Sequence, residues 1–525
     1  MYYFVPAWYA TNRPWYAASQ EWTRVYEEIA FDDTINQVQL FAEAGEAVRL
    51  IFLTYQPQLR YELHEKGLLG QVYWSFFDDI QNISRTHTRP IDFTALAWPK
   101  GTEFLYTPFA VFAKKDGVLL AKIAFASSGN LLEIQWQKEG QPQYTYLFDD
   151  RGFLSSILYY DGAGQALYQD YLNENGVWQV REHLQATEEP AIEINWFSDH
   201  VFAKKHYADW GELVQERLAL LAKQVLTDQD TLVLASHALH NQMLLDSFPQ
   251  QKRVLSFFGQ RYSLENKEAL VELVKQVDLL VTESKDHGKL LEEALKEAGS
   301  PSRGLLVISP FDSRLRLGQS QSMRFQDLYF RVDGLSTKEV KEHLIGLFPL
   351  LAKREDLLLT LVTYERWKSF EDLKAWMESY LLAHFDREDF FMESLAPGEN
   401  PVDEPSWELS RMRFINLVRT DQIIQELDQA RLVIDLAPQP DLYTQIASLS
   451  AGLPQIHQSP TDYVRHKENG WLLSEEGTLE EAVAYYVNSL SHWNKALVHT
   501  VERMAENSSG RLLAQWRELL ERNLS

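Results

Sequence analysis

Six glycines between residues 117 and 176 follow one another at intervals of 12, 11, 12, 12 and 12 residues. They are Gly117, Gly129, Gly140, Gly152, Gly164 and Gly176. Each lies in a polar turn, and the segments between them, such as LLEIQW and YTYLF, have the apolar and β-branched content of strands. One strand and one turn repeat in this way in an antiparallel meander, where glycine adopts the positive φ that the turns require. The spacing therefore predicts an extended antiparallel β-sheet domain, which we place at residues 66–197.

Strands and helices alternate on both sides of this segment. Before it, residues 48–54 have the pattern of a buried strand, and Asp32 and Asp33 stand at the start of a helix, where carboxylates cap free amides. After it, amphipathic helices separate apolar runs at 231–236, 253–259, 279–284 and 304–310. Strands that alternate with helices form a parallel, doubly wound sheet. We therefore expect a first Rossmann-like lobe made of residues 1–65 and 198–302.

A second set of strands and helices is expected within residues 303–505. Its strands are predicted at 357–364, 413–418, 431–437 and 470–474. Thr420 is the predicted N-cap of one helix, and the acidic, proline-containing residues 394–409 are predicted to be a surface loop. The tail from Thr478 is predicted to be long amphipathic helix, with residues 506–525 as a C-terminal helix. The predicted fold class is α/β, with two Rossmann-like lobes and an inserted antiparallel β-meander domain.

The chain carries a net charge of −25 and contains no cysteine. This charge repels phosphate groups, so we expect no nucleic acid partner and no direct contact with an anionic membrane. Without cysteine the chain has no disulfide, thiolate nucleophile or cysteine-ligated metal. The N-terminus lacks the basic region of a signal peptide, and no apolar run approaches the roughly 18 to 20 residues of a membrane span. We therefore expect a soluble cytoplasmic protein that reaches the membrane only through partner proteins.

Other patterns that could indicate catalysis or metal binding are weak. His237 and His240 could share one helix face, but the sequence supplies no third ligand, so no metal site is predicted. Adjacent aspartates, such as 78–79 and 149–150, would face opposite ways in a strand and are expected in solvated turns. We predict no catalytic residue, metal or cofactor.

Three motifs resemble those of one protein family, and a fourth resembles a turn found in many retaining glycosyltransferases. They are MYYFVPAWYATNRPWY at the N-terminus, FDDTINQVQLF at 31–41, HKENGWLL at 466–473 and the Ala-Gly-Leu-Pro turn at 451–454. Two Rossmann-like lobes with a β-meander in the first resemble the GT-B glycosyltransferases, especially the bacterial enzymes that modify serine-rich repeat adhesins. The N-terminal motifs narrow the resemblance to the first accessory secretory proteins of the streptococcal and staphylococcal accessory Sec system, and the similarity runs over the full length.

This resemblance implies a non-catalytic, GT-B-like subunit without a cofactor. Its partners would be the second and third accessory secretory proteins, the accessory SecA ATPase, and a serine-rich repeat adhesin that carries N-acetylglucosamine. The complex would support export of that adhesin. Acetyl transfer would belong to the second protein, and this chain would be a scaffold that binds glycan.

The residues at the expected donor site agree with a non-catalytic role. In many retaining GT-B enzymes two glutamates, eight positions apart, precede a small-Gly-Leu-Pro turn, and this register places them at Gln439 and Ala447, neither of which is an acid. A nucleotide diphosphate also needs cationic partners. Arg331 and Lys338 are the candidates, but Asp333 stands between them and would repel a diphosphate. We therefore expect both to be surface residues.

Three hypotheses remain open. In the first, the chain is a pseudo-glycosyltransferase whose interlobe cleft binds a glycan or a peptide, because open α/β sheets bind ligands at strand ends. In the second, it is an active retaining glycosyltransferase in which Glu426 or Asp435 replaces the lost acids. In the third, it is a scaffold without affinity for sugar. The cleft candidates of the first hypothesis are Trp8, Tyr9, Asp312, Asp441 and Thr444.

Overall fold

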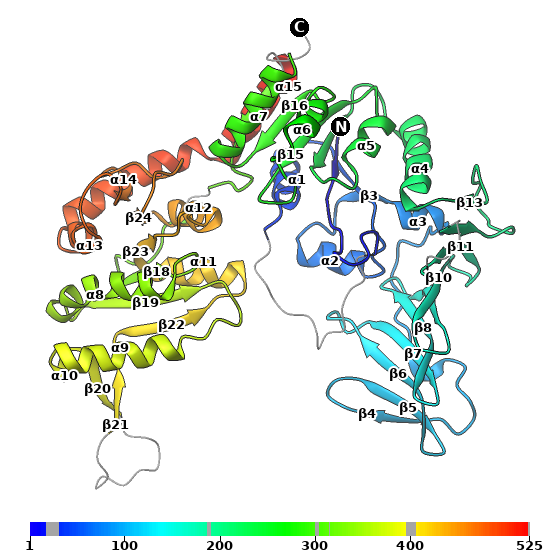
Figure 1. The fold of residues 1–525 in the computed structure, drawn as a ribbon, viewed down its shortest axis with the longest axis horizontal. Helices are drawn as coiled ribbons and strands as arrows, with labels where there is room; N and C mark the ends of the chain where they lie inside the picture. Colours follow the sequence, from blue (N-terminus) through cyan, green and yellow to red (C-terminus); the bar gives the residue numbers. More distant parts are fainter. Residues whose placement is uncertain (17–30, 186–190, 300–303, 314–315, 395–405, 523–525) are drawn as a thin grey trace. The chain divides into compact units, whose positions relative to one another are not determined.

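The computed structural model of the chain describes residues 1–16, 31–185, 191–299, 304–313, 316–394 and 406–522. These residues divide into two compact units. Within the described ranges, unit 1 contains residues 1–16, 32–185, 191–299, 304–310 and 516–522, and unit 2 contains residues 31, 311–313, 316–394 and 406–515. Figure 1 shows both units and labels most of their helices and strands.

Unit 1 is built on a seven-stranded parallel sheet with the strand order β17-β16-β15-β14-β1-β2-β3 (Figure 1). Its strands are β1 (Tyr2–Val5), β2 (Val48–Phe52), β3 (Val72–Ser75), β14 (Thr231–Ala235), β15 (Lys252–Phe257), β16 (Leu279–Thr282) and β17 (Gly304–Val307). Its helices are α1 (Asp33–Glu43), α2 (Leu59–Glu65), α3 (Phe76–Ile80), α4 (Trp210–Val225), α5 (Asn241–Ser247), α6 (Lys267–Val274) and α7 (Lys285–Glu297). β3 and β17 pair within this sheet although they follow the predicted domain boundaries at residues 65 and 302.

A ten-stranded antiparallel sheet is inserted between β3 and α4, and its strands β4 to β13 are neighbours in sequence order. The strands are β4 (Glu103–Tyr106), β5 (Val111–Lys115), β6 (Val118–Phe125), β7 (Leu131–Lys138), β8 (Gln141–Asp149), β9 (Phe153–Tyr160), β10 (Ala166–Leu172), β11 (Trp178–His183), β12 (Ile192–Ile194) and β13 (His206–Tyr207). All six glycines of the predicted turns have a positive φ. The predicted meander is therefore confirmed. Tyr171, Val180, Ile192 and Ile194 attach it to the core of unit 1.

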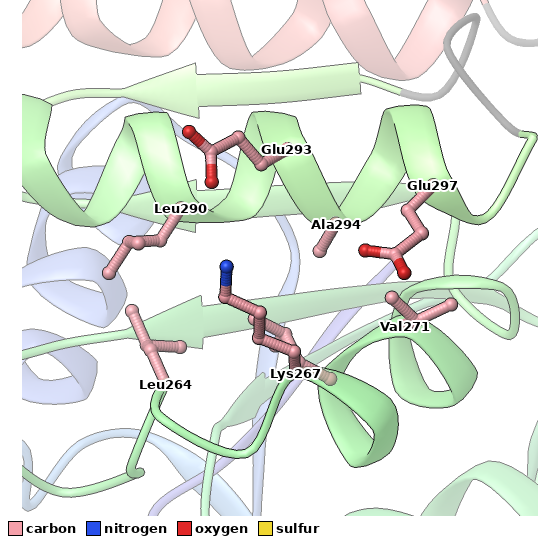
Figure 2. A pocket seen from close by; sticks show the side chains of 8 residues that line it. Leu264, Lys267, Val271, Leu290, Glu293, Ala294 and Glu297 are labelled. Atoms are coloured by element: carbon pink, nitrogen blue, oxygen red, sulfur yellow. The ribbon is translucent and has the colours of Figure 1, made fainter.

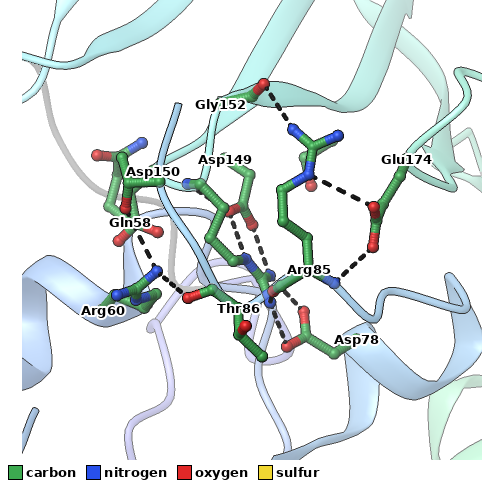
Figure 3. A network of polar contacts seen from close by, with 12 residues as sticks. Gln58, Arg60, Asp78, Arg85, Thr86, Asp149, Asp150, Gly152 and Glu174 are labelled. Atoms are coloured by element: carbon green, nitrogen blue, oxygen red, sulfur yellow. Dashed lines mark hydrogen bonds and ion pairs between the residues drawn. The ribbon is translucent and has the colours of Figure 1, made fainter. Parts of the chain in front are cut away.

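A buried polar network joins the β8–β9 turn to helices α2 and α3 (Figure 3). Arg151 donates to Asp149 at 2.7 and 2.8 Å and to Asp78 at 2.6 and 2.9 Å. Asp150 accepts a hydrogen bond of 2.9 Å from the N–H of Tyr61 in the first turn of α2. Asp149 and Asp150 are buried, so the solvated turn predicted for this pair is wrong. Arg151 neutralises the carboxylate of Asp149, while Asp150 is satisfied by the N–H of Tyr61 and has a raised pKa because of its burial.

Unit 2 is built on a six-stranded parallel sheet with the order β22-β19-β18-β23-β24-β25 (Figure 1). Its strands are β18 (Gln326–Arg331), β19 (Leu357–Thr363), β22 (Met412–Asn416), β23 (Ala430–Asp435), β24 (Gln455–His457) and β25 (Gly470–Leu472). Its helices are α8 (Thr337–Lys353), α9 (Glu371–His384), α10 (Arg387–Phe390), α11 (Thr420–Gln429), α12 (Leu442–Ala451), α13 (Leu479–Val487) and α14 (Leu490–Glu506). The sheet and helices enclose one large apolar core.

Three local predictions in unit 2 need correction. The predicted loop at 394–409 includes β21 (Ser406–Leu409), which pairs with β20 (Phe391–Ser394), while residues 395–405 lie outside the described part. Arg419, not Thr420, occupies the N-cap of α11, because the side chain of Gln422 accepts from the N–H of Arg419.

The predicted long helix at the C-terminal tail is divided into α13, α14 and α15 (Ser509–Arg522). Ser489 starts α14 by accepting a hydrogen bond from the N–H of His492. None of the described helices is both long enough and apolar enough to cross a membrane.

Candidate functional site

The carboxyl ends of three neighbouring strands in unit 2 bring polar side chains together. Arg331 ends β18, Asp435 ends β23 and Thr363 ends β19, and β18 lies between the other two strands. Open parallel α/β sheets bind ligands at this edge. We therefore treat this group as the candidate site and call it the strand-end cluster. Its members are Arg331, Asp333, Tyr364, Lys368, Asp435, Asp441 and Thr444.

The guanidinium group of Arg331 forms an ion pair in the interior of the protein. The register of β18 and β23 sets it beside Asp435, and its Nη1 donates to Asp435 Oδ2 over 3.1 Å. The Arg331 side chain is 13% exposed and the Asp435 side chain 0%. Burial lowers the pKa of Arg331, but the carboxylates of Asp435 and Asp441 outweigh this, so its pKa is raised. The surface position predicted for Arg331 is therefore wrong, because β18 is a central strand.

Asp333 is the second anion of the cluster. Its carboxylate accepts hydrogen bonds from Thr363 Oγ1 at 2.5 Å and from the N–H of Tyr364 at 2.7 Å. Lys368 Nζ lies 3.2 Å from one oxygen and Arg331 Nε lies 3.6 Å from the other. Asp333 is buried, so these four groups replace the water that an exposed carboxylate would hold.

Asp441 links the cluster to helix α12. It is the N-cap of that helix, and its Oδ1 accepts from both the N–H and the Oγ1 of Thr444, at 2.8 and 2.6 Å. Its own N–H donates to Asp435 over 2.8 Å. Tyr364 completes the link, since its hydroxyl lies 2.5 Å from Thr444 Oγ1. Burial raises the pKa of Asp441, and this effect outweighs the charge of Arg331, which acts to lower the pKa.

The cluster has little capacity for a nucleotide diphosphate. Its two cations, Arg331 and Lys368, are matched by Asp435 and Asp333, and Asp441 adds a third carboxyl group. A diphosphate would have to break these ion pairs and enter beside carboxylates, which costs electrostatic free energy. The arrangement favours neutral hydrogen-bonding ligands over anions.

The predicted donor positions differ in exposure and in surroundings. Gln439 is exposed in the loop between β23 and α12, and Ala447 lies on α12 against the apolar core. Lys338 projects from the first turn of α8 with 85% exposure, and its Nζ lies 3.7 Å from Glu342. Of the alternative acids, Asp435 is bound to Arg331, and Glu426 pairs with Arg413 at 3.0 Å.

The five predicted cleft residues fall into separate groups. Asp441 and Thr444 lie together in the strand-end cluster. Asp312, also in unit 2, is hydrogen-bonded to Ser509. Trp8 and Tyr9 follow β1 in unit 1, where Trp8 Nε1 donates to the helix cap Asp32. The role of these residues in binding a ligand stays a prediction.

Tyr9 and His240 form a defined pair at the carboxyl edge of the unit 1 sheet. His240 Nε2 lies 2.7 Å from the carbonyl oxygen of Ala235, which can only accept, so Nε2 carries the proton. Nδ1 is then free to accept from the Tyr9 hydroxyl, 2.7 Å away. Burial lowers the pKa of His240 to about 3, so the ring is neutral. Among the described residues no group of three or more His, Asp or Glu side chains is placed to hold a metal.

A hollow of about 300 Å³, open to solvent, lies between α6 and α7 in unit 1. Figure 2 shows the Lys267 side chain of α6 pointing toward Glu293 and Leu290 of α7. The other residues that line the hollow are mostly apolar, such as Leu264 and Ala294. The hollow lies between helices and not at strand ends, so it is a weaker candidate than the strand-end cluster.

Sequence analysis missed Tyr364 and Lys368 as members of the cluster. Tyr364 directly follows β19, so the strand-end rule that selected Asp441 would also have selected it. Lys368 lies four residues farther along the loop, and no local pattern indicates that it reaches Asp333.

Comparison with known proteins identifies the family. The family model described as the first accessory Sec system protein, accessory secretory protein 1, matches residues 1–523. The protein of that name from Streptococcus gordonii is 33% identical over 526 residues, which is 99% of either chain. Two solved complexes contain similar chains. In the glycosylation-associated Gap123 complex of Streptococcus agalactiae the chain is 36% identical, with a TM-score of 0.77 and complete coverage of both chains.

In the complex of accessory secretory proteins 1, 2 and 3 of Streptococcus pneumoniae the matching chain is 31% identical. Its TM-score is 0.81, over 100% of this chain and 99% of that one. The fold is also that of GT-B glycosyltransferases, since the GtfA/B complex matches with a TM-score of 0.69 at 12% identity over the full length of both chains. The predicted fold class is thus confirmed. The chain belongs to the accessory Sec system family of accessory secretory protein 1.

Proposed function

We propose that this chain is a non-catalytic subunit of an accessory Sec complex. It would bind the second and third accessory secretory proteins, together with the glycan or peptide of a serine-rich repeat adhesin that carries N-acetylglucosamine, and so support export of that adhesin. The accessory SecA ATPase would be a further partner. The proposal places the chain in the cytoplasm, at the membrane only through its partners.

The pairing of Arg331 with Asp435 and of Lys368 with Asp333 carries this proposal. A retaining glycosyltransferase must stabilise a departing nucleotide diphosphate with free cations. In the strand-end cluster both cations are already neutralised, and the positions expected for the donor glutamates hold Gln439 and Ala447. A GT-B fold without these donor-site residues supports a protein that keeps the fold of a glycosyltransferase but has a different function.

A neutral sugar makes other demands on a binding site than a diphosphate does. Its hydroxyl groups form hydrogen bonds with carboxylates, hydroxyl groups and amides. Such contacts need no free cation, so the same electrostatics that disfavour a diphosphate tolerate a glycan.

The test is calorimetric titration of the full chain with two ligands in parallel. One is a uridine-diphosphate sugar and the other is a serine-rich peptide that carries N-acetylglucosamine. Binding of the glycopeptide without binding of the nucleotide sugar is the expected result. Tight binding of the nucleotide sugar would overturn the proposal and favour an active transferase, and no binding of either ligand would favour a scaffold without affinity for sugar.

A further inference from the structure

The indole ring of Trp367 lies mainly in solvent. Its exposed fraction is 74%, and among the described tryptophans only Trp196, with 72%, is exposed to a similar degree. Tryptophan is on average a highly buried residue, because its large ring is mostly apolar. Since single exposed apolar residues are nevertheless common, the surroundings of each ring must decide whether its exposure has a function.

Trp367 lies next to the candidate site, whereas Trp196 does not. Tyr364 and Lys368, both members of the strand-end cluster, flank Trp367 in the loop that follows β19. We call residues 364–368 the rim loop. Trp196 follows β12 in the antiparallel inserted sheet of unit 1. Of the two exposed rings, only that of Trp367 therefore stands at the carboxyl edge of a parallel sheet, where such folds bind ligands.

Hydrogen bonds hold the rim loop in place. Asn416, the last residue of β22, donates from Nδ2 to the carbonyl oxygens of residues 365, 366 and 368, at 2.9, 3.3 and 2.8 Å. The N–H of Lys368 donates to the carbonyl oxygen of Glu365 over 3.2 Å and closes a turn that contains Trp367. The backbone that carries Trp367 is therefore ordered before a ligand binds, which lowers the entropic cost of binding.

Polar groups at the rim loop are accessible, while those inside the cluster are engaged. Asp333 uses both of its oxygens within the protein, and Asp441 Oδ1 accepts two hydrogen bonds from Thr444. The Glu365 side chain is 63% exposed and lies 3.3 Å from Lys368, so it can also accept hydrogen bonds from hydroxyl groups of a ligand. A ligand that fits this rim needs a flat apolar face for the indole ring and hydroxyl groups at its edge.

The charges around the rim loop have both signs. The guanidinium carbon of Arg366 lies over the Trp367 ring, 5.2 Å from the ring centre, and Glu365 adds a carboxylate. Lys368 is already paired with Asp333. An anionic ligand therefore meets no excess of positive charge here, in a chain whose net charge is −25. A pyranose sugar is neutral, presents C–H groups on one face and carries hydroxyl groups around its ring, so it fits these surroundings.

We infer that a sugar ring of the adhesin glycan, N-acetylglucosamine, stacks on Trp367. This inference rests on the proposed function and names the residue that makes the sugar contact. The apolar face of the sugar would cover the indole ring, and both surfaces would leave water. Hydroxyl groups of the sugar would donate hydrogen bonds to Glu365.

The test is titration calorimetry of the full chain with a serine-rich peptide that carries N-acetylglucosamine, and with the same peptide without sugar. Trp367→Ala should weaken binding of the glycopeptide about 10-fold or more, because aromatic contacts dominate binding energy. Trp367→Phe keeps a smaller aromatic ring and should weaken binding less. The matched control is Trp196→Ala, which removes a similarly exposed ring from unit 1 and should leave binding unchanged. Both alanine variants replace exposed side chains, so both should stay folded.

Three results would overturn the inference while the proposed function stands. In the first, Trp367→Ala binds the glycopeptide as tightly as the unmodified chain does; if this variant instead loses affinity for the second accessory secretory protein, the ring is a protein contact. In the second, Trp367→Ala weakens binding of the sugar-free peptide to the same extent, so Trp367 contacts peptide and not sugar. In the third, Trp196→Ala weakens glycopeptide binding as much as Trp367→Ala does. If the unmodified chain does not bind the glycopeptide, glycan binding fails as part of the proposed function, and the inference fails with it.

Discussion

Arg331 and Asp435 are 104 positions apart in sequence, yet their side chains form a buried ion pair of 3.1 Å at the ends of two adjacent strands. The pair exists because β18 and β23 align in parallel register, which places the last residue of each strand side by side. A buried ion pair adds little net stability, but removal of one partner leaves an uncompensated charge in the interior. Because Arg331 is already neutralised, the strand-end cluster has low affinity for anions. Substitution of either residue alone should destabilise the fold.

Arg331→Met should lower the free energy of unfolding by about 3–5 kcal/mol, because Asp435 would stay buried without its cation. Urea denaturation of the variant and the unmodified chain measures this loss. The double variant Arg331→Met/Asp435→Asn is the control, since it removes both charges and should recover part of the stability. Asp435→Asn is also made alone. If the stability losses of the two single variants add up to the loss of the double variant, the two residues do not interact.

The sequence predicted the inserted sheet well because its signal is local. Each turn glycine is marked by its own neighbours, and all six have the positive φ that the spacing predicts. The same is true of Asp32, which caps α1 by accepting hydrogen bonds from residues two and three positions later. Strands that alternate with helices form parallel sheets by general rules of connection, so the fold class could also be predicted.

The strand-end cluster could not be predicted in the same way. The partner of Arg331 depends on which strand lies beside β18 and in which register, and neither is encoded near residue 331. Lys368 reaches Asp333 from a loop after β19, and Asp441 reaches Asp435 through its own N–H. Short motifs indicated that the donor glutamates are missing. The ion pairs found in the strand-end cluster depend on tertiary contacts, which these motifs do not encode.

Asp150 should make the stability of unit 1 depend on pH. Burial, followed by the charge of Asp149, raises the pKa of Asp150 to about 7 from its ordinary 3.8. The folded chain therefore keeps a proton between pH about 4 and 7 that the unfolded chain loses, so stability falls as pH rises through this window.

Asp150→Asn removes this titration, and between pH 5 and pH 8 the variant should lose about 1–3 kcal/mol less stability than the unmodified chain. Thermal unfolding at both pH values measures the difference. Asp161→Asn is the control, since hydrogen bonds from its own turn, led by the N–H of Gln165, lower the pKa of that exposed carboxyl. Parallel pH profiles for Asp150→Asn and the unmodified chain would contradict the prediction.

Gly152 is the turn glycine whose side-chain position is occupied by backbone atoms. Its φ is +88°, and a Cβ there would lie 1.7 Å from the carbonyl oxygen of Arg89, a backbone atom that cannot rotate away. Gly152→Ala should therefore destabilise unit 1 by about 3 kcal/mol or more, through both backbone strain and steric conflict. Chemical denaturation measures the loss.

Gly117→Ala separates the two causes. Gly117 has a similar φ of +79°, but nothing lies within 4 Å of an added Cβ. It should therefore cost only the strain of a left-handed alanine, about 1–2 kcal/mol. If the two alanine variants lose the same stability, the close approach of Arg89 has no energetic effect.

Trp516 should anchor the end of the chain to unit 1. It is buried on α15, and its ring meets Phe41 of α1 edge to face at a centroid distance of 5.3 Å. The carbonyl oxygen of Leu520, one turn later, accepts a hydrogen bond of 3.2 Å from Lys252. Trp516→Ala should cost about 3–5 kcal/mol, the usual loss when a large aromatic side chain leaves a core.

Hydrogen exchange with and without this substitution would locate the effect. Protection should fall in α1 and in the last turns of α15, because these elements lose their shared contact, while the sheet of unit 2 should keep its protection. Glu521→Ala, an exposed position on the same helix, should change stability by less than about 0.5 kcal/mol. If α1 is equally protected in both variants, α15 adds no stability to unit 1. The polar contacts of α15 then do not stabilise the fold.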